Sequence, residues 1–125
     1  MRVEIVFTTE PIAVPPLHPG SLEVGACVEF QGIVRETEGG QALAGLHYEA
    51  YEAMARRRLA EHCAELAAAH PCVAVVFIHR LGWVPVGEAS LFVRVLAKHR
   101  GAALGYCGEL IDRMKADVPI WKAAE

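Results

Sequence analysis

The lysines of this 125-residue chain, at positions 98, 115 and 122, all lie in its last quarter. Lys115 and Lys122 stand on either side of a short segment that contains Pro119 and Trp121, whereas the arginines are spread along the whole sequence. Lysines that serve only to solvate a surface are expected to be scattered as the arginines are. A lysine ammonium group binds anions, and unlike a guanidinium it can also lose its proton when its pKa is lowered. The grouping predicts a site for an anionic substrate near the end of the chain.

A second group of cations, formed by Lys98, His99 and Arg100, precedes Gly101 at the expected junction of a strand and a helix. The first backbone N–H groups of a helix have no partner within the helix, so they could converge with these side chains on one anion. A phosphate group would suit such a site. The alternative is that the three cations only solvate a loop.

Arg35 ends a stretch of small and apolar residues and precedes a glycine-containing loop. A guanidinium held at a strand end can bind a carboxylate or phosphate through two parallel hydrogen bonds. Each candidate also has a plainer interpretation. Arg35 could be an exposed charge at a strand end, Lys115 could stabilise a helix C-terminus by about 0.3–1 kcal/mol, and Lys122 could lie along the surface beside Trp121.

Other reactive residue types show no catalytic pattern. The six histidines include no pair spaced four residues apart on a helix and no carboxylate cluster with ligand spacing, so a catalytic metal is not expected. His79 and Arg80 form a second His-Arg pair at a strand end, where we expect a structural role. The motifs G-x-S-x-G, the P-loop and G-x-G-x-x-G are absent, which disfavours hydrolases and nucleotide-binding folds.

The four cysteines are far apart in the sequence and each lies in an apolar segment. No C-x-x-C pair is present, so neither a zinc site nor a disulfide framework is indicated. We expect buried thiols at Cys27, Cys63, Cys72 and Cys107.

The pattern of apolar residues predicts the order β-β-β-α-β-β-α, which indicates an α+β domain. The second and third predicted strands are expected to pair as a long hairpin. Residues 82–87 are expected to form a turn, and the proline-rich residues 11–19 a rigid loop. The predicted strands cover residues 3–7, 23–34, 43–50, 72–79 and 89–97, and the predicted helices cover residues 51–69 and 101–116.

Each predicted helix carries an apolar stripe that would face the sheet. Pro119, shortly after the second predicted helix, fixes the end of that helix. The stripes consist of Met54, Leu59, Cys63, Leu66 and Ala67 in the first helix and of Leu104, Cys107, Leu110, Ile111 and Met114 in the second.

The overall composition limits the class of protein. Residues 1–125 suit one domain, and an apolar fraction of 54% is high enough that part of it is expected at an interface with another chain. A net charge of −3 opposes a nucleic-acid partner. No apolar run is long enough to span a bilayer, and Glu4 lies where a signal peptide would be apolar. We expect a cytoplasmic protein.

Five segments, taken together and in order, resemble the large catalytic subunit of molybdopterin synthase. The resemblance covers roughly residues 25–122, and the order of the segments makes it specific although each one alone is modest. The segments are Phe30-Gln31-Gly32-Ile33-Val34-Arg35, then residues 46–55, then His79-Arg80-Leu81-Gly82 with residues 86–88, then His99-Arg100, then Lys115 with Pro119-Ile120-Trp121-Lys122.

The resemblance implies an α/β-hammerhead domain that forms a homodimer, with a small ubiquitin-like subunit at each end of a heterotetramer. The small subunit would insert a C-terminal Gly-Gly tail that carries a thiocarboxylate. Sulfur would pass twice to cyclic pyranopterin monophosphate, forming the dithiolene of molybdopterin and opening the cyclic phosphate. No cofactor is expected.

The resemblance also implies roles for individual residues. Lys115 matches the central catalytic lysine and is expected to act as acid and base, and Lys122 matches the second lysine of the pocket. Arg35, His99 and Arg100 match residues that hold the pterin phosphate, some of them from across the dimer. The competing hypothesis is a non-catalytic homodimer that binds anions or acts as a scaffold.

Overall fold

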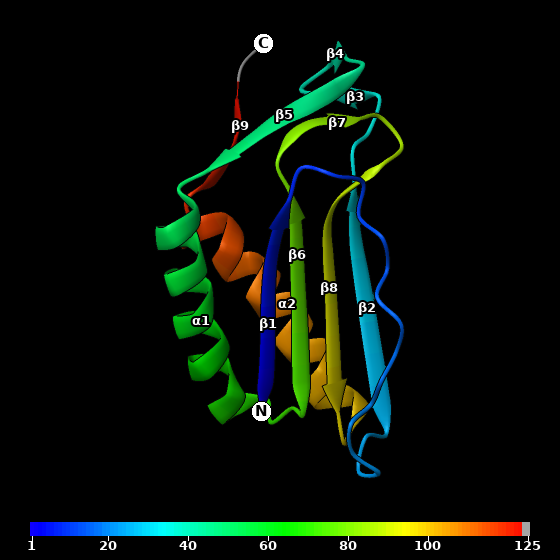
Figure 1. The fold of residues 1–125 in the computed structure, drawn as a ribbon, viewed down its shortest axis with the longest axis vertical. Helices are drawn as coiled ribbons and strands as arrows, with labels where there is room; N and C mark the ends of the chain where they lie inside the picture. Colours follow the sequence, from blue (N-terminus) through cyan, green and yellow to red (C-terminus); the bar gives the residue numbers. More distant parts are fainter. Residues whose placement is uncertain (124–125) are drawn as a thin grey trace.

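The computed structural model describes residues 1–123, which build a mixed α and β structure. A four-stranded sheet has the order β1-β6-β8-β2, in which β1 is parallel to β6 and the other neighbours are antiparallel. Helices α1 and α2 lie together along one face of this sheet (Figure 1). The predicted α+β class is therefore confirmed. The bounds are Arg2–Thr8 for β1, Ala26–Ile33 for β2, Ala74–Arg80 for β6, Ala89–Ala97 for β8, Glu52–Ala69 for α1 and Arg100–Asp117 for α2.

A smaller sheet crosses one end of the main sheet, beyond the C-terminal end of α2 (Figure 1). Its order is β7-β5-β9, and all pairs in it are antiparallel. A hairpin of two short strands, β3 and β4, lies beside it. The bounds are Thr37–Glu38 for β3, Gln41–Ala42 for β4, Gly45–Ala50 for β5, Gly82–Pro85 for β7 and Ile120–Ala123 for β9.

The core lies between the main sheet and the helices. Strands β6 and β8 occupy the centre of the sheet and are buried on both faces, which explains their nearly continuous apolar sequences. From the sheet, Phe77 and Val93 are fully buried, and from the helices Leu59, Tyr106 and Leu110 are fully buried against them. This packing fixes where α2 ends relative to the sheet.

The proline-rich segment has no regular structure and runs along the side of the sheet that the helices leave uncovered (Figure 1). Arg94 projects from β8 on that side, where its guanidinium donates to the carbonyls of Pro15 and Pro16 at 2.8 and 3.3 Å. It also bonds the carboxylate of Glu29 at 2.6 Å. The segment therefore has no helix or strand, as expected, and the buried Arg94 binds it to the sheet.

Several local predictions were wrong. The expected hairpin between residues 23–34 and 43–50 does not form, because β2 pairs with β8 whereas β5 pairs with β7 and β9. The intervening residues turn back on themselves as β3 and β4, with Gly39 and Gly40 at positive φ of 58° and 79°. Part of the expected turn at 82–87 is strand β7, and β9 was not predicted. The predicted order of elements therefore lacked β3, β4, β7 and β9.

The helix bounds agree with the prediction to within one residue, but the buried faces differ in detail. Met54 is exposed and Ala55 is buried in its place, while Leu104 is exposed beside the buried Ala103. At these two positions the buried residue is therefore a neighbour of the one predicted. The cysteines are also divided: Cys63 and Cys107 are buried, as expected, whereas Cys72 is partly exposed and Cys27 is exposed.

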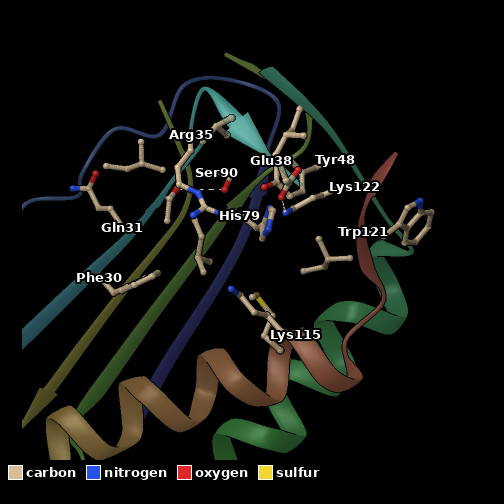
Figure 2. Close-up of a pocket in the computed structure, with 17 residues that line it drawn as sticks. Phe30, Gln31, Arg35, Glu38, Tyr48, His79, Ser90, Lys115, Trp121 and Lys122 are labelled. Carbon is tan, nitrogen blue, oxygen red and sulfur yellow. Dashed lines mark hydrogen bonds and ion pairs between the residues drawn. The ribbon is translucent and has the colours of Figure 1, made fainter. Parts of the chain in front are cut away.

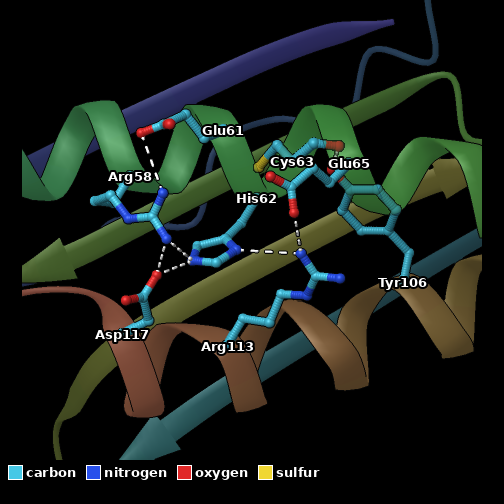
Figure 3. Close-up of polar contacts among 8 residues, drawn as sticks. All are labelled: Arg58, Glu61, His62, Cys63, Glu65, Tyr106, Arg113 and Asp117. Atoms are coloured by element: carbon cyan, nitrogen blue, oxygen red, sulfur yellow. Dashed lines mark hydrogen bonds and ion pairs between the residues drawn. The ribbon is translucent and has the colours of Figure 1, made fainter.

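A polar cluster joins α1 to α2 close to the C-terminal end of α2 (Figure 3). Asp117 accepts hydrogen bonds from Arg58 and from Nε2 of the buried His62, the latter at 2.6 Å. Arg113 donates to Nδ1 of His62 at 3.2 Å and to Glu65 at 2.8 Å. A guanidinium can only donate, so Nδ1 accepts and the imidazole proton lies on Nε2, facing Asp117. The cluster fixes the last turns of α2 against α1.

Candidate functional site

A cavity of about 610 Å³ opens where the two sheets meet the C-terminal end of α2. Strands of both sheets and the helix end each contribute a wall, so the cavity depends on the packing just described (Figure 2). Cations from three separate parts of the chain enter it, together with one carboxylate and three aromatic or imidazole side chains that carry polar atoms. The polar lining residues that matter for its chemistry are Arg35, Glu38, Tyr48, His79, Lys115 and Lys122.

Lys115 and Lys122 reach the cavity from opposite sides of a chain reversal. Lys115 lies in the last turn of α2, and the helix ends at Asp117. Pro119 cannot continue the helix, and its carbonyl accepts a hydrogen bond from the Tyr51 N–H at 3.1 Å. The chain then enters β9, where Lys122 lies opposite Tyr48 of β5. The prediction that these lysines bracket a turn and share a site is consistent with this geometry.

The charge environments of the two lysines differ. Lys122 forms an ion pair with Glu38, which projects from β3 (Figure 2). Among residues 1–123, no carboxylate lies within ion-pairing distance of Lys115. Lys115 is also exposed to solvent through the open side of the cavity. Its ammonium group is thus available to an incoming anion without displacing a partner.

Arg35 enters the cavity from the end of β2. The backbone before it is held by the neighbouring Val34, which donates to the Glu88 carbonyl at 3.0 Å and accepts from Gly87 at 2.8 Å. The register of β2 on β8 shifts between Gly32 and Ile33, where the strand leaves the sheet. This anchoring directs the guanidinium toward the lysines from the opposite wall (Figure 2).

His99 and Arg100 do not line this cavity. They lie at the N-terminal end of α2 and are exposed, next to Lys98, which approaches Glu23 at 3.9 Å. Lys115 follows Arg100 by 15 residues in the same helix, so about 22 Å of helix separates them. One copy of the chain therefore brings together Arg35, Lys115 and Lys122 but leaves His99 and Arg100 at a distance.

His79 was expected to have a structural role, as was Arg80, and the structure separates the two. Arg80 is buried and pairs with Glu88 at 2.6 Å, on the face of the sheet away from the helices. His79 instead lines the cavity, and burial lowers the pKa of its imidazole. Strand alternation places residues 75, 77 and 79 on the helix-facing side of β6. That alternation was the one signal in the sequence that could have identified His79.

Within residues 1–123, no group of three or more His, Cys, Asp or Glu side chains is arranged to hold a metal ion. No helix of this described part is long and apolar enough to cross a membrane.

Comparison with known proteins decides the family. The family model described as MoaE protein matches residues 7–117, a range that includes Arg35 and Lys115 and ends before Lys122. The chain belongs to the MoaE protein family. It is 49% identical over 105 residues to a molybdopterin synthase catalytic subunit of Oryza sativa subsp. indica, covering 84% of this chain and 54% of the rice protein. It is 37% identical over 120 residues to the human protein of the same name, covering 94% of this chain and 64% of the human one.

The fold of this MoaE family member also matches a solved structure. The molybdopterin biosynthesis MoaE protein from Burkholderia ambifaria MC40-6 aligns with a TM-score of 0.84 at 28% identity, over 98% of this chain and 82% of that one. The family resemblance seen in the sequence is thereby confirmed. The chain spans about half the length of the rice relatives it matches.

Proposed function

We propose that this chain is the catalytic subunit of a molybdopterin synthase and transfers sulfur to a pterin substrate. The sulfur donor would be the C-terminal thiocarboxylate of a small ubiquitin-like partner, and the acceptor would be cyclic pyranopterin monophosphate. The relatives that carry this name cover most of the chain. The product would be the dithiolene of molybdopterin, with the cyclic phosphate opened.

The observation that carries the proposal is the convergence of Arg35, Lys115 and Lys122 on one cavity. Both proposed reactants are anions, and both would be stabilised by fixed positive charge once the entering tail has excluded water from the cations. An ammonium group can also hand a proton to sulfur or oxygen, which a guanidinium does not do. Lys115 would serve as acid and base next to the transferred sulfur, and Lys122 would stabilise the negative charge.

The shape of the cavity suits an extended tail as the donor. It is open on one side, and β9 at its rim is an edge strand of the smaller sheet within the described residues. A Gly-Gly tail has no side chains beyond Cα, so it can enter a narrow passage and place its terminal thiocarboxylate beside the exposed Lys115. Its entry would also cover Lys115 and exclude water from the cations.

We further propose that the active assembly is a homodimer in which His99 and Arg100 of one copy bind the phosphate in the cavity of the other. Their position at the far end of α2 supports this arrangement, because they cannot reach the cavity of their own copy across about 22 Å of helix. Exposed apolar side chains on edge strand β2, Phe30 and Ile33, offer surface for a second chain.

The test is reconstitution. The purified chain is mixed with a thiocarboxylated Gly-Gly partner and cyclic pyranopterin monophosphate, and dithiolene is assayed against the same partner in its carboxylate form. Dithiolene formation that depends on the thiocarboxylate supports the proposal. Binding of the partner without any sulfur transfer would instead support the scaffold hypothesis.

A further inference from the structure

His79 occupies the inner wall of the cavity, yet the sulfur transfer outlined above assigns it no task. It is the last helix-facing residue of β6 and is only 4% exposed. Figure 2 shows its ring turned into the cavity that Lys115 and Lys122 enter from other elements. A buried imidazole at this position is costly unless its polar atoms are used.

The tautomer of His79 follows from its contacts. Nδ1 lies 2.8 Å from the carbonyl oxygen of Arg80. A carbonyl can only accept, so Nδ1 carries the proton, and in the neutral ring Nε2 holds a free lone pair. The ring also packs edge-on against Tyr48, with 5.1 Å between ring centroids. These two contacts fix both the orientation and the protonation of the ring.

Nε2 of His79 has no hydrogen-bond partner within residues 1–123. In this part of the chain, the fully buried side-chain nitrogens without a partner belong to His70 and Arg80. Because Nε2 of His79 is not one of them, it is accessible rather than enclosed. Nε2 of His79 therefore reaches the cavity as an oriented acceptor. Such an atom can receive a proton from a molecule in the cavity, provided that the ring is neutral.

The surroundings keep the ring neutral near neutral pH. Burial lowers the pKa of His79, and the bond to the Arg80 carbonyl opposes this shift only in part. The charged groups that face the cavity are the cations of Arg35, Lys115 and Lys122 and the carboxylate of Glu38, which is paired with Lys122. The phenol of Tyr48 completes the titratable groups at the ring. Added positive charge beside a row of cations is disfavoured.

Sulfur transfer from a thiocarboxylate contains a step that needs such an acceptor. Once the sulfur has bonded to the substrate, tail and substrate are joined as an acyl thioester, R–C(=O)–S–R′. To release the tail, a water oxygen must bond to the acyl carbon while the C–S bond breaks and its electron pair stays on sulfur. The tail leaves as a carboxylate and the substrate as a thiolate, so two protons are released and no oxidant or reductant is needed.

We propose that His79 is a further catalytic residue, whose Nε2 takes the first proton from the water that hydrolyses this thioester. The second proton passes to solvent when the carboxylic acid ionises. Lys115, from the opposite wall, stabilises the departing thiolate. The inference rests on the proposed sulfur transfer and adds to it a division of work between an imidazole that accepts a proton and an ammonium group that stabilises the thiolate.

The experiment follows a single turnover with saturating thiocarboxylated partner and cyclic pyranopterin monophosphate, with intact-mass detection of the acyl thioester. His79→Asn keeps a donor for the Arg80 carbonyl and removes Nε2. We expect the thioester to form and then to accumulate, because its breakdown slows on the order of 100-fold without the base. His47→Asn is the matched control, since His47 lies on β5 outside the cavity, and it should behave as the wild type.

A pH profile gives a readout that a structural role would not affect. Because the neutral ring is required, thioester breakdown in the wild type should fall as the pH drops through the pKa of His79, on the acid side of the ordinary value of 6.5. That acid limb should be absent in His79→Asn. Wild-type breakdown rates in the variant, or a wild-type profile without an acid limb, would overturn the assignment.

Two further outcomes are separated by the same measurement. If His79→Asn does not fold, His79→Gln and the wild-type profile carry the test, and a pH-independent wild-type rate still overturns the role of His79. If the wild type yields neither thioester nor dithiolene, the proposed sulfur transfer itself is overturned, and the assignment of His79 falls with it.

Discussion

At the scale of single residues, Lys115 has to be separated from an ordinary helix-end cation, because any positive charge in the last turn stabilises a helix by about 0.3–1 kcal/mol. Lys115→Arg keeps that charge but replaces the ammonium with a group that does not release its proton. We expect normal folding and partner binding, with single-turnover dithiolene formation slowed on the order of 100-fold or more. Lys122→Arg should lose less, because its proposed role is electrostatic.

Lys98→Arg is the control for the Lys115 prediction, since Lys98 is exposed outside the cavity. It should retain the wild-type rate. A near wild-type rate for Lys115→Arg would remove the acid and base role and leave only an electrostatic one.

The ion pair between Glu38 and Lys122 is a second feature that can be tested at this scale. In the proposed complex, an anionic tail that approaches Lys122 competes with the Glu38 carboxylate for its ammonium group. Both side chains are partly exposed, and exposed ion pairs are worth about 0.2–1 kcal/mol. Glu38→Gln should therefore bind a Gly-Gly tail peptide about 1.5–5-fold more tightly, a range that corresponds to this energy.

Glu36→Gln is the matched control for Glu38→Gln, because it makes the same change of charge in the same loop without a partner among the described ion pairs. Titration calorimetry at low salt measures both variants. Equal tightening by both would mean that the net charge of the loop matters rather than the displacement of Glu38.

Sequence reasoning identified part of the site and missed the rest for physical reasons. The late clustering of lysines indicated an anion site, and the structure does bring Lys115, Lys122 and Arg35 to one cavity. Glu38 could not be predicted to share it, and strand alternation could have placed His79 only on the helix-facing side of its strand. Glu38 reaches Lys122 only because β3 and β4 fold over the cavity, and the value of His79 depends on which nitrogen carries the proton.

At the scale of elements, the polar cluster between α1 and α2 holds the helix turn that carries Lys115. Hydrogen bonds from Arg58 and His62 lower the pKa of Asp117 below its ordinary value of 3.8. A lowered folded-state pKa means that the carboxylate contributes stability that is fully present above pH 3.8 and is lost as the pH falls through the folded-state value. Asp117→Asn should therefore lower the free energy of unfolding at neutral pH.

The pH dependence identifies the cause of that loss. The difference between the wild type and Asp117→Asn should persist at neutral and mildly acidic pH and shrink below pH 3.8, as measured by urea unfolding. Asp112→Asn, on the exposed side of the same helix, is the control and should change little. A difference that does not depend on pH would show that Asp117 acts through packing rather than through its charge.

The elements that sequence reasoning predicted well are those whose stability comes from long apolar patterns. The strand at 89–97 was placed to the residue, and both helices to within one residue at each end, because buried strands and amphipathic helices have distinct periods. Strands β7 and β9 have four residues each, and prolines lie in or beside them. They exist because β5 lies between them and supplies hydrogen bonds to both, which is information that no local pattern contains.

At the scale of the whole molecule, the position of His99 and Arg100 gives the sharpest test of a shared active site. We consider two inactive proteins, Lys115→Ala and the double variant His99→Ala with Arg100→Ala, co-expressed with different tags. If each cavity takes His99 and Arg100 from the other copy, a mixed dimer contains one intact site. Its second site then lacks Lys115 as well as His99 and Arg100. If all the residues act within one copy, a mixed dimer contains no intact site.

Random assortment makes half of the dimers mixed, so co-expression should restore about a quarter of the wild-type dithiolene activity, and purification through both tags should raise this to about half. Neither variant alone should show activity above background. Sedimentation of each variant must first give twice the 13.6 kDa mass of the chain, because the argument requires that the substitutions leave the dimer intact. Mixed dimers that stay inactive would show that His99 and Arg100 serve their own copy, an active double variant would show that they do not bind the substrate, and a chain that sediments as a monomer would exclude a shared site altogether.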